Sequence, residues 1–182
     1  VSSAYREYDL ILSDDGGAEL DSDNVMKQCF TVMREAAGGA GEPVRGIGIS
    51  SQGEAFTAVD GDGNALSNGM VTSDVRSAPY VAQFPGSFGE DRLYQITGHT
   101  AHTMFTLFKI LWLRDNRPEA WANARMFLCM EDLLQLHLGL DPAISWSLAG
   151  RTMMFDVRKH EWSEEILSAA GVREDQLARP MP

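Results

Sequence analysis

A short run of alternating glycine and isoleucine decides much about how this chain can fold. Residues 44–50 read VRGIGIS and have the apolar side chains Val44, Ile47 and Ile49. Such a run suits a buried strand that neighbouring backbone approaches closely, because glycine leaves room for the approach. Polar residues follow directly, so we expect a strand that delivers polar groups at one edge of a sheet.

The order of the other elements predicts an α/β domain. Residues 1–10 alternate like a strand, residues 56–59 and 65–71 read as extended chain, and the dense turn signal at residues 60–64 joins these two. From residue 91 onward the period becomes helical. Helices are expected at residues 23–37, 91–97, 103–115, 118–124, 131–138 and, from a cap at Ser163, up to Ala170, with a short strand at 125–129. Strands that precede helices, without a fixed repeat, are typical of this fold class.

Length and charge exclude several classes of protein. A chain of 182 residues fits one domain, since domains usually hold roughly 100–200 residues. The formal net charge of -11 disfavours binding to nucleic acid or to an anionic membrane. The most apolar stretch, residues 104–113, is shorter than the ~20 residues that cross a bilayer, so we expect a cytoplasmic protein. Cys29 and Cys129 lack metal or disulfide spacing and are expected as free thiols.

Two motif interpretations of residues 46–53 fail on spacing. A dinucleotide fingerprint needs glycine where Ser51 stands, and a nucleophile elbow around Ser50 needs glycine where Gln52 stands. No helix is expected after either motif. A hydrolase that uses Ser50 or Ser51 is therefore a weak hypothesis, also because no recognisable triad segment accompanies them.

Two polar clusters follow strand ends and are the candidate ligand sites. Ser51, Gln52 and Glu54 come after the first strand, at the edge where open α/β sheets bind ligands. Asp74 and Arg76 follow the second and could hydrogen-bond a polyhydroxylated ligand. The alternatives are a solvated loop and a surface ion pair. We expect the carboxylates of Glu54 and Asp74 to point into one cleft and to be partly exposed, since burial without a ligand would raise their pKa values.

Other polar residues favour structural roles. His99 and His102 have no carboxylate at a ligating spacing, so no metal site is expected. Lys109 is the only lysine in a strongly apolar helix. We expect its alkyl stem to lie along the core and its ammonium group to reach solvent, rather than to contact a phosphate.

Five segments in order resemble the N-terminal domain of the FGGY family of carbohydrate kinases, which includes xylulokinase and glycerol kinase. They are residues 18–21 (AELD), 46–66 (GIGISSQGEAFTAVDGDGNAL), 68–78 (NGMVTSDVRSA), 97–121 (TGHTAHTMFTLFKILWLRDNRPEAW) and 148–172 (LAGRTMMFDVRKHEWSEEILSAAGV). Lys109, Trp112 and Pro118 are in register with the family pattern.

The resemblance implies an actin-like, ribonuclease H-like fold that is incomplete at its start. Residues 1–182 would be the sugar-binding N-terminal domain fragment. The family's phosphate-binding hairpin would precede Val1, and the catalytic base and the nucleotide-binding second domain would follow Pro182. ATP and Mg²⁺ would serve the complete enzyme and would not bind this chain alone. The isolated chain is expected to be marginally stable or prone to aggregation, and catalytically silent.

The resemblance also places the substrate side. Gln52, Gly53 and Glu54 fall on the substrate-contact turn of the family, and Asp74 and Arg76 match its pattern. The usual tryptophan is replaced by Thr72, and Met104 replaces the tyrosine of glycerol kinase. A smaller Thr72 and an unhindered Gly53 would enlarge the pocket.

The leading hypothesis is therefore ATP-dependent phosphorylation of a sugar or polyol, with a pentulose such as xylulose favoured. The partner would be a small-molecule substrate, without nucleic acid or membrane, and a homodimer is possible. The alternative is a non-catalytic, truncated relative that binds a sugar or a partner.

Overall fold

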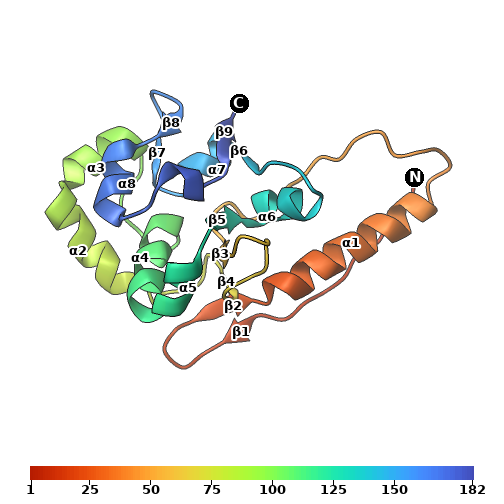
Figure 1. Ribbon diagram of the computed structural model, residues 1–182, viewed down its shortest axis with the longest axis horizontal. Coiled ribbons are helices and arrows are strands. Elements are labelled where there is room, and N and C mark those ends of the chain that lie inside the picture. The colour runs from red at the N-terminus through yellow and green to blue at the C-terminus, as the bar shows by residue number, and fades with distance from the viewer.

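A computed structural model describes residues 1–182 and shows a five-stranded sheet with the strand order β1-β2-β4-β3-β5, in which every neighbouring pair is antiparallel (Figure 1). The strands of this sheet are β1 (Ile11–Leu12), β2 (Ala18–Leu20), β3 (Phe56–Val59), β4 (Gly69–Met70) and β5 (Met126–Cys129). Two small ladders complete the strands: β6 (Ala143–Ser145) pairs in parallel with β9 (Arg179–Met181), and β7 (Phe155–Asp156) pairs with β8 (Glu161–Trp162).

Helices and strands alternate along the chain, and the longest run of consecutive helices lies between β4 and β5. They are α1 (Ser22–Gly38), α2 (Ala78–Phe88), α3 (Glu90–Thr97), α4 (Thr106–Asn116), α5 (Pro118–Asn123), α6 (Met130–His137), α7 (Trp146–Gly150), α8 (Glu164–Ala170) and the 3₁₀ turn η1 (Glu174–Gln176). None of them is both long enough and apolar enough to span a membrane. The α/β class predicted from the order of elements is confirmed.

Capping residues mark the helix starts as the sequence indicates. Asp21 accepts a hydrogen bond from the backbone N–H of Asn24 at 2.9 Å and begins α1. Ser163 accepts one from the backbone N–H of Ile166 and begins α8, which ends at Gly171 in the left-handed conformation. An N-cap side chain satisfies a backbone donor that the first turn leaves without a partner. The predicted helices at these places are confirmed within a few residues.

Helix α2 was not predicted. Its sequence, APYVAQFPGSF, contains Pro85 and Gly86 and buries only Phe84 and Pro85. Proline and glycine are poor residues inside a helix, and the segment shows no broad apolar face, so its pattern did not indicate a helix. Tertiary packing supports it instead: the Phe84 ring stacks on Phe88 and meets Phe108 of α4 edge-on.

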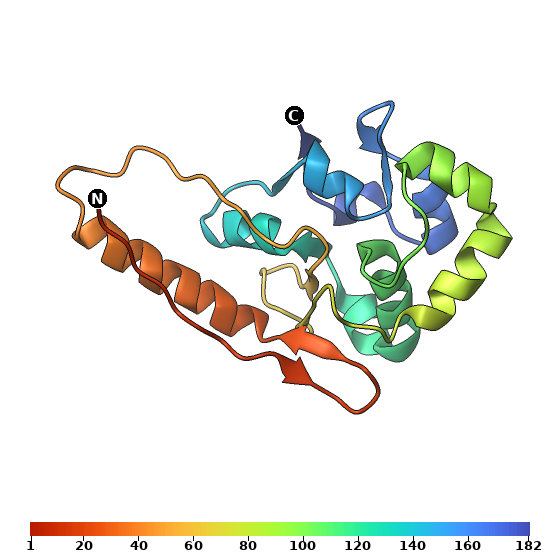
Figure 2. The same cartoon turned by 180° about the vertical axis from the view of Figure 1, so that it is seen from behind.

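The prediction of a buried strand at residues 44–50 is wrong. The segment has no strand pairing in the structure, and the side chains of Val44 and Ile47 are 59% and 57% exposed. The expected strand at residues 1–10 is also unpaired, and only Ile11–Leu12 joins the sheet. Neither segment joins the open sides of the two edge strands, β1 and β5, and the pattern of one segment cannot show whether a partner strand lies beside it. Figure 2 shows the N-terminal segment running beside α1.

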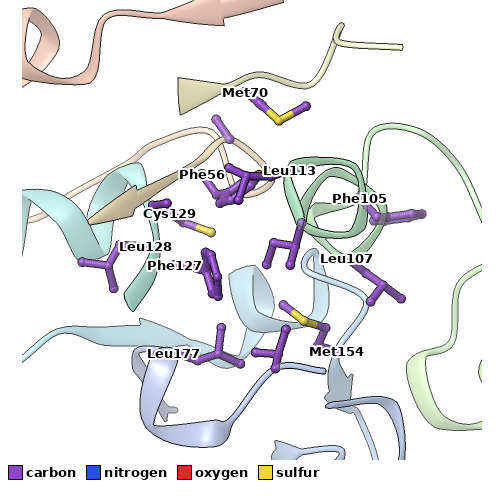
Figure 3. Packing of buried hydrophobic residues seen from close by; sticks show 14 of the residues in the cluster. Phe56, Met70, Phe105, Leu107, Leu113, Phe127, Leu128, Cys129, Met154 and Leu177 are labelled. Carbon is purple, nitrogen blue, oxygen red and sulfur yellow. The ribbon is translucent and has the colours of Figure 1, made fainter. Parts of the chain in front are cut away.

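The core lies between the sheet and helix α4. Nearly every side chain of α4 from Thr106 to Leu113 is buried. The ring of Phe56 on β3 meets that of Phe127 on β5 edge-on, with 6.3 Å between the ring centroids. Figure 3 shows these strand residues facing Leu113 of α4, with Met154 and Leu177 from the C-terminal third of the chain beneath. This packing fixes the start of β3 and the end of β4 against α4.

We expect Ile110→Val in α4 to lower the free energy of unfolding by about 0.5–1.5 kcal/mol, because the lost methylene leaves a void in a packed core. Ile110 is 0% exposed, whereas Ile11 is 45% exposed, so Ile11→Val is a matched control that should change the stability little. Urea titration measures both. Equal losses from the two variants would contradict the assignment of α4 to the core.

Candidate functional site

The start of β3 and the end of β4 bring two predicted site residues together. Phe56 is paired with Met70 in the antiparallel ladder, so the residues before β3 lie beside the residues after β4. The hydroxyl of Thr72 donates a hydrogen bond to Oε2 of Glu54 at 3.3 Å. The residue pairing therefore carries a carboxylate and a hydroxyl to the same place.

Arg151 completes this cluster. It is the C-cap residue of α7, and its Nε donates to Oε1 of Glu54 at 2.6 Å, while its Nη2 donates to the same oxygen. The guanidinium group also lies over the ring of Phe105, 5.3 Å from the centroid, and its Nη2 is 3.8 Å from the sulfur of Met104. Glu54 is only 6% exposed, so this ion pair stabilises a carboxylate that burial would otherwise penalise.

Sequence reasoning did not find Arg151. It stands between Leu148-Ala149-Gly150 and Thr152-Met153-Met154, and a single cation in an apolar segment is the only signal that could have singled it out. Met104 was predicted, and the structure places its sulfur beside Arg151.

The predicted open space beside Gly53 is not there. A Cβ atom on Gly53 would lie 2.5 Å from Cδ2 of Leu148 and 3.4 Å from Cβ of Arg151. Helix α7 therefore fills the volume that the missing side chain leaves. The absence of a side chain at Gly53 leaves room for Leu148 and does not enlarge a pocket.

The prediction that the ammonium group of Lys109 reaches solvent is wrong. Lys109 is 0% exposed, and its Nζ donates to the backbone carbonyls of Glu54 at 2.8 Å and Val71 at 3.2 Å. Burial lowers the pKa of Lys109 from 10.5 to about 8, because the charged form loses hydration. The reason for the error is that the two strand ends supply carbonyl acceptors inside the core, which the pattern of one helix cannot show.

We expect Lys109→Met to remove a pH-dependent part of the stability. Between about pH 8 and pH 10.5 the unfolded chain binds more protons at this lysine than the folded chain does. The free energy of unfolding of the wild type therefore increases with pH in this window. The variant lacks that gain. The free energy of unfolding of the wild type should therefore rise relative to that of the variant as pH increases from about 8 to 10.5.

Urea titrations at several pH values within this window measure the effect. Lys27 is exposed on α1, so Lys27→Met is the control and should follow the wild type. Parallel pH curves for the wild type and Lys109→Met would contradict the lowered pKa of Lys109.

Asp74 and Arg76 form a second buried cluster. The carboxylate of Asp74 accepts from the backbone N–H of Ala18 at 3.0 Å and from Nη2 of Arg76 at 2.6 Å, and the same Nη2 donates to Glu19. The Arg76 guanidinium also lies 4.0 Å from the ring centroid of Trp112. Burial opposes the charge of Arg76, yet the hydrogen bonds that it donates to Asp74 and Glu19 outweigh burial and raise the pKa of Arg76.

The expectation of two partly exposed carboxylates is therefore wrong. Asp74 is 0% exposed and Glu54 is 6% exposed. Their carboxylates share no partner: Glu54 pairs with Arg151, and Asp74 pairs with Arg76. Each has found a counter-charge inside the protein, which removes the reason for exposure.

We expect Arg76→Gln to lower the free energy of unfolding by about 3–5 kcal/mol, because it leaves the buried Asp74 without its cation. Arg92→Gln breaks the surface pair with Glu165, where both side chains are about half exposed, and should cost no more than about 1 kcal/mol. Urea titration compares the two. A small loss from Arg76→Gln would contradict a structural role for the Asp74–Arg76 pair.

The remaining candidates lie at the margins of this region. Gln52 is exposed and, with Ser51, lines a groove of about 520 Å³ between α1 and residues 47–52. His99 packs against Phe105, with 4.9 Å between the rings, and burial followed by the charge of Arg151 lowers its pKa. His102 accepts a hydrogen bond at Nδ1 from the backbone N–H of Met104.

The glycine turn before β2 offers no open cradle for a nucleotide phosphate. No three His, Cys, Asp or Glu side chains gather in one place in the structure. In the glycine turn before β2, Asp15 accepts from Ser13 Oγ and from the backbone N–H of Gly17, and a Cβ on Gly17 would meet Ser13 and Arg76. The turn is thus filled and bonded by its own residues.

Comparison with known proteins agrees with this architecture. The sequence matches the family model described as the FGGY family of carbohydrate kinases, N-terminal domain, over residues 1–181. It is 32% identical to a xylulose kinase of Lactococcus lactis over 132 residues, which are 72% of this chain and 26% of that protein.

Solved structures show the same fold. A gluconate kinase from Lactobacillus acidophilus has a TM-score of 0.92 at 21% identity, over 100% of this chain and 37% of that one. A glycerol kinase from Plasmodium falciparum, solved with ADP, has a TM-score of 0.89 at 23% identity, over 96% of this chain and 37% of that one.

The fold is thus the actin-like α/β fold that these kinases share, as predicted. The chain belongs to the FGGY family of carbohydrate kinases. It spans only 26% of the xylulose kinase and 37% of each of the two solved kinases.

Proposed function

We propose that this chain is the sugar-binding part of an ATP-dependent kinase that phosphorylates a hydroxyl group of a sugar or polyol. The observation that carries the proposal is the cluster of Glu54, Thr72 and Arg151. A carboxylate oxygen accepts from a hydroxyl group, and a guanidinium group donates to its oxygen, so the pair can hold a polyhydroxylated ligand. The cluster lies where β3 begins and β4 ends, so two neighbouring strands deliver its polar groups to one place.

The role of these residues is to bind and orient the substrate. Phosphoryl transfer depends mainly on positioning the reacting groups and on stabilising the charge of the transferred group. Residues that fix the substrate hydroxyl supply part of the positioning. ATP with Mg²⁺ supplies the phosphoryl group when bound. We place its site, with the catalytic base, in a further part of the protein, because side chains fill the glycine turn before β2.

Two observations support this division of labour. The chain spans a minor part of each relative compared above. In addition, residues 44–50 expose apolar side chains and unpaired backbone, as expected for a strand whose neighbour belongs to another segment.

Within the site we propose that Glu54, Thr72 and Met104 face the substrate, with Gln52 at the rim. Asp74 and Arg76 support the turn from which Thr72 projects, since the Asp74 carboxylate is 0% exposed and already bonded. A pentulose such as xylulose is the favoured substrate, because Thr72 is smaller than the tryptophan of the family pattern.

The test follows ADP release from the full-length gene product and from residues 1–182 alone, with a panel of pentuloses, hexuloses and polyols. We expect turnover by the full-length product and none by the chain alone. Sugar-stimulated ADP release from the purified chain would contradict the proposed division. A full-length product that binds a sugar without releasing ADP would favour the non-catalytic binding module.

A further inference from the structure

The counter-charge of Glu54 comes from a distant part of the chain. Arg151 lies 97 residues after Glu54, and its Nε and Nη2 both donate to Oε1. The other carboxylate oxygen, Oε2, accepts only from Thr72 at 3.3 Å, and Nη1 of Arg151 has no hydrogen-bond partner in the chain. Oε2 of Glu54 therefore keeps capacity to accept a hydrogen bond, and Nη1 of Arg151 keeps capacity to donate one.

The surroundings hold the guanidinium group in this position. It lies over the Phe105 ring and beside the Met104 sulfur, and the side chain of Arg151 is 35% exposed. Gly53 leaves the space into which Arg151 and Leu148 pack. The Glu54–Arg151 pair is therefore held in one geometry, and Arg151 is its more exposed member.

The charges near the pair balance. Lys109 lies behind Glu54, bound to backbone carbonyls, and Arg76 is bound to Asp74 and Glu19. Three cations, Arg76, Lys109 and Arg151, therefore stand with three carboxylates, Glu19, Glu54 and Asp74. The region has no excess positive charge to attract an anion.

We propose that Glu54, whose charge is balanced by Arg151, is a specificity-determining residue that makes the site select an uncharged sugar or polyol over a sugar acid. This inference rests on the proposed function. A hydroxyl group can donate to Oε2 of Glu54 while another substrate oxygen accepts from Nη1 of Arg151. A substrate carboxylate would instead compete with Glu54 for the same guanidinium group and stand beside a like charge, and such repulsion is an effective source of discrimination.

Three variants of the full-length product test this: Glu54→Gln, Arg151→Gln and the double variant. The readout is the ratio of kcat/KM for xylulose or glycerol to kcat/KM for gluconate. We expect the wild type to favour the neutral compounds. In Glu54→Gln the guanidinium group loses its internal anion, so the ratio should fall roughly tenfold or more, the size of one hydrogen bond to a charged group.

Arg151→Gln leaves Glu54 without a cation and should not lower the ratio, and the double variant should lie between the two single variants. Glu165→Gln, which alters only the surface pair with Arg92, is the matched control and should keep the ratio of the wild type. Circular dichroism and thermal midpoints confirm that each variant is folded.

An unchanged ratio in folded Glu54→Gln would overturn the inference, and so would a wild type that prefers gluconate. If the wild type phosphorylates no compound, the proposed function fails, and calorimetric titration of wild type and Glu54→Gln with xylulose and gluconate then decides the inference. Tighter gluconate binding by Glu54→Gln than by the wild type supports it. Equal binding, or no binding of either compound, contradicts it.

Discussion

The ammonium group of Lys109 joins the three elements on which the candidate site depends. Its hydrogen bonds to the carbonyls of Glu54 and Val71 tie the start of β3 and the end of β4 to helix α4. The Thr106 hydroxyl adds a second donor to the Glu54 carbonyl at 3.1 Å. Burying a charge costs free energy, and here hydrogen bonds and the nearby carboxylates of Glu54 and Asp74 offset part of the cost. The backbone of the site is therefore held from inside the core.

The two buried carboxylates are equivalent in chemistry and different in use. Asp74 accepts hydrogen bonds from two backbone N–H groups and from the Arg76 side chain, so no acceptor capacity faces outward. Glu54 has one well-bonded oxygen and one that accepts only the hydroxyl of Thr72. A closed cluster stabilises the fold, whereas a cluster with remaining donors and acceptors can bind a ligand. Burial does not distinguish Asp74 from Glu54, because both are almost fully buried. Their hydrogen-bond partners do distinguish them.

Local chemistry made the capped helices α1 and α8 predictable, whereas long-range contacts decided features such as helix α2. Asp21 and Ser163 indicate helix starts, because an N-cap side chain bonds a backbone N–H within the first turn of its own helix. The family resemblance likewise rests on short segments that keep their order. The pattern of residues 44–50 indicates strand character, but it cannot say whether a neighbouring strand exists. The burial of Lys109 depends on carbonyls 38 and 55 residues away in sequence, which no pattern along α4 contains.

Arg151 shows why the site is the last feature that a sequence reveals. It sits at the end of α7, a helix of five residues, and so short a helix has little stability of its own in water. Its neighbours hold it: Ser145 caps it, and β6 before it pairs with β9 at residues Arg179–Met181. The segment that carries the counter-charge of Glu54 is thus supported by the C-terminal strand. Gly53 packs against Leu148 and Arg151 of this segment, so the charge of the site depends on the packing of segments from both halves of the chain.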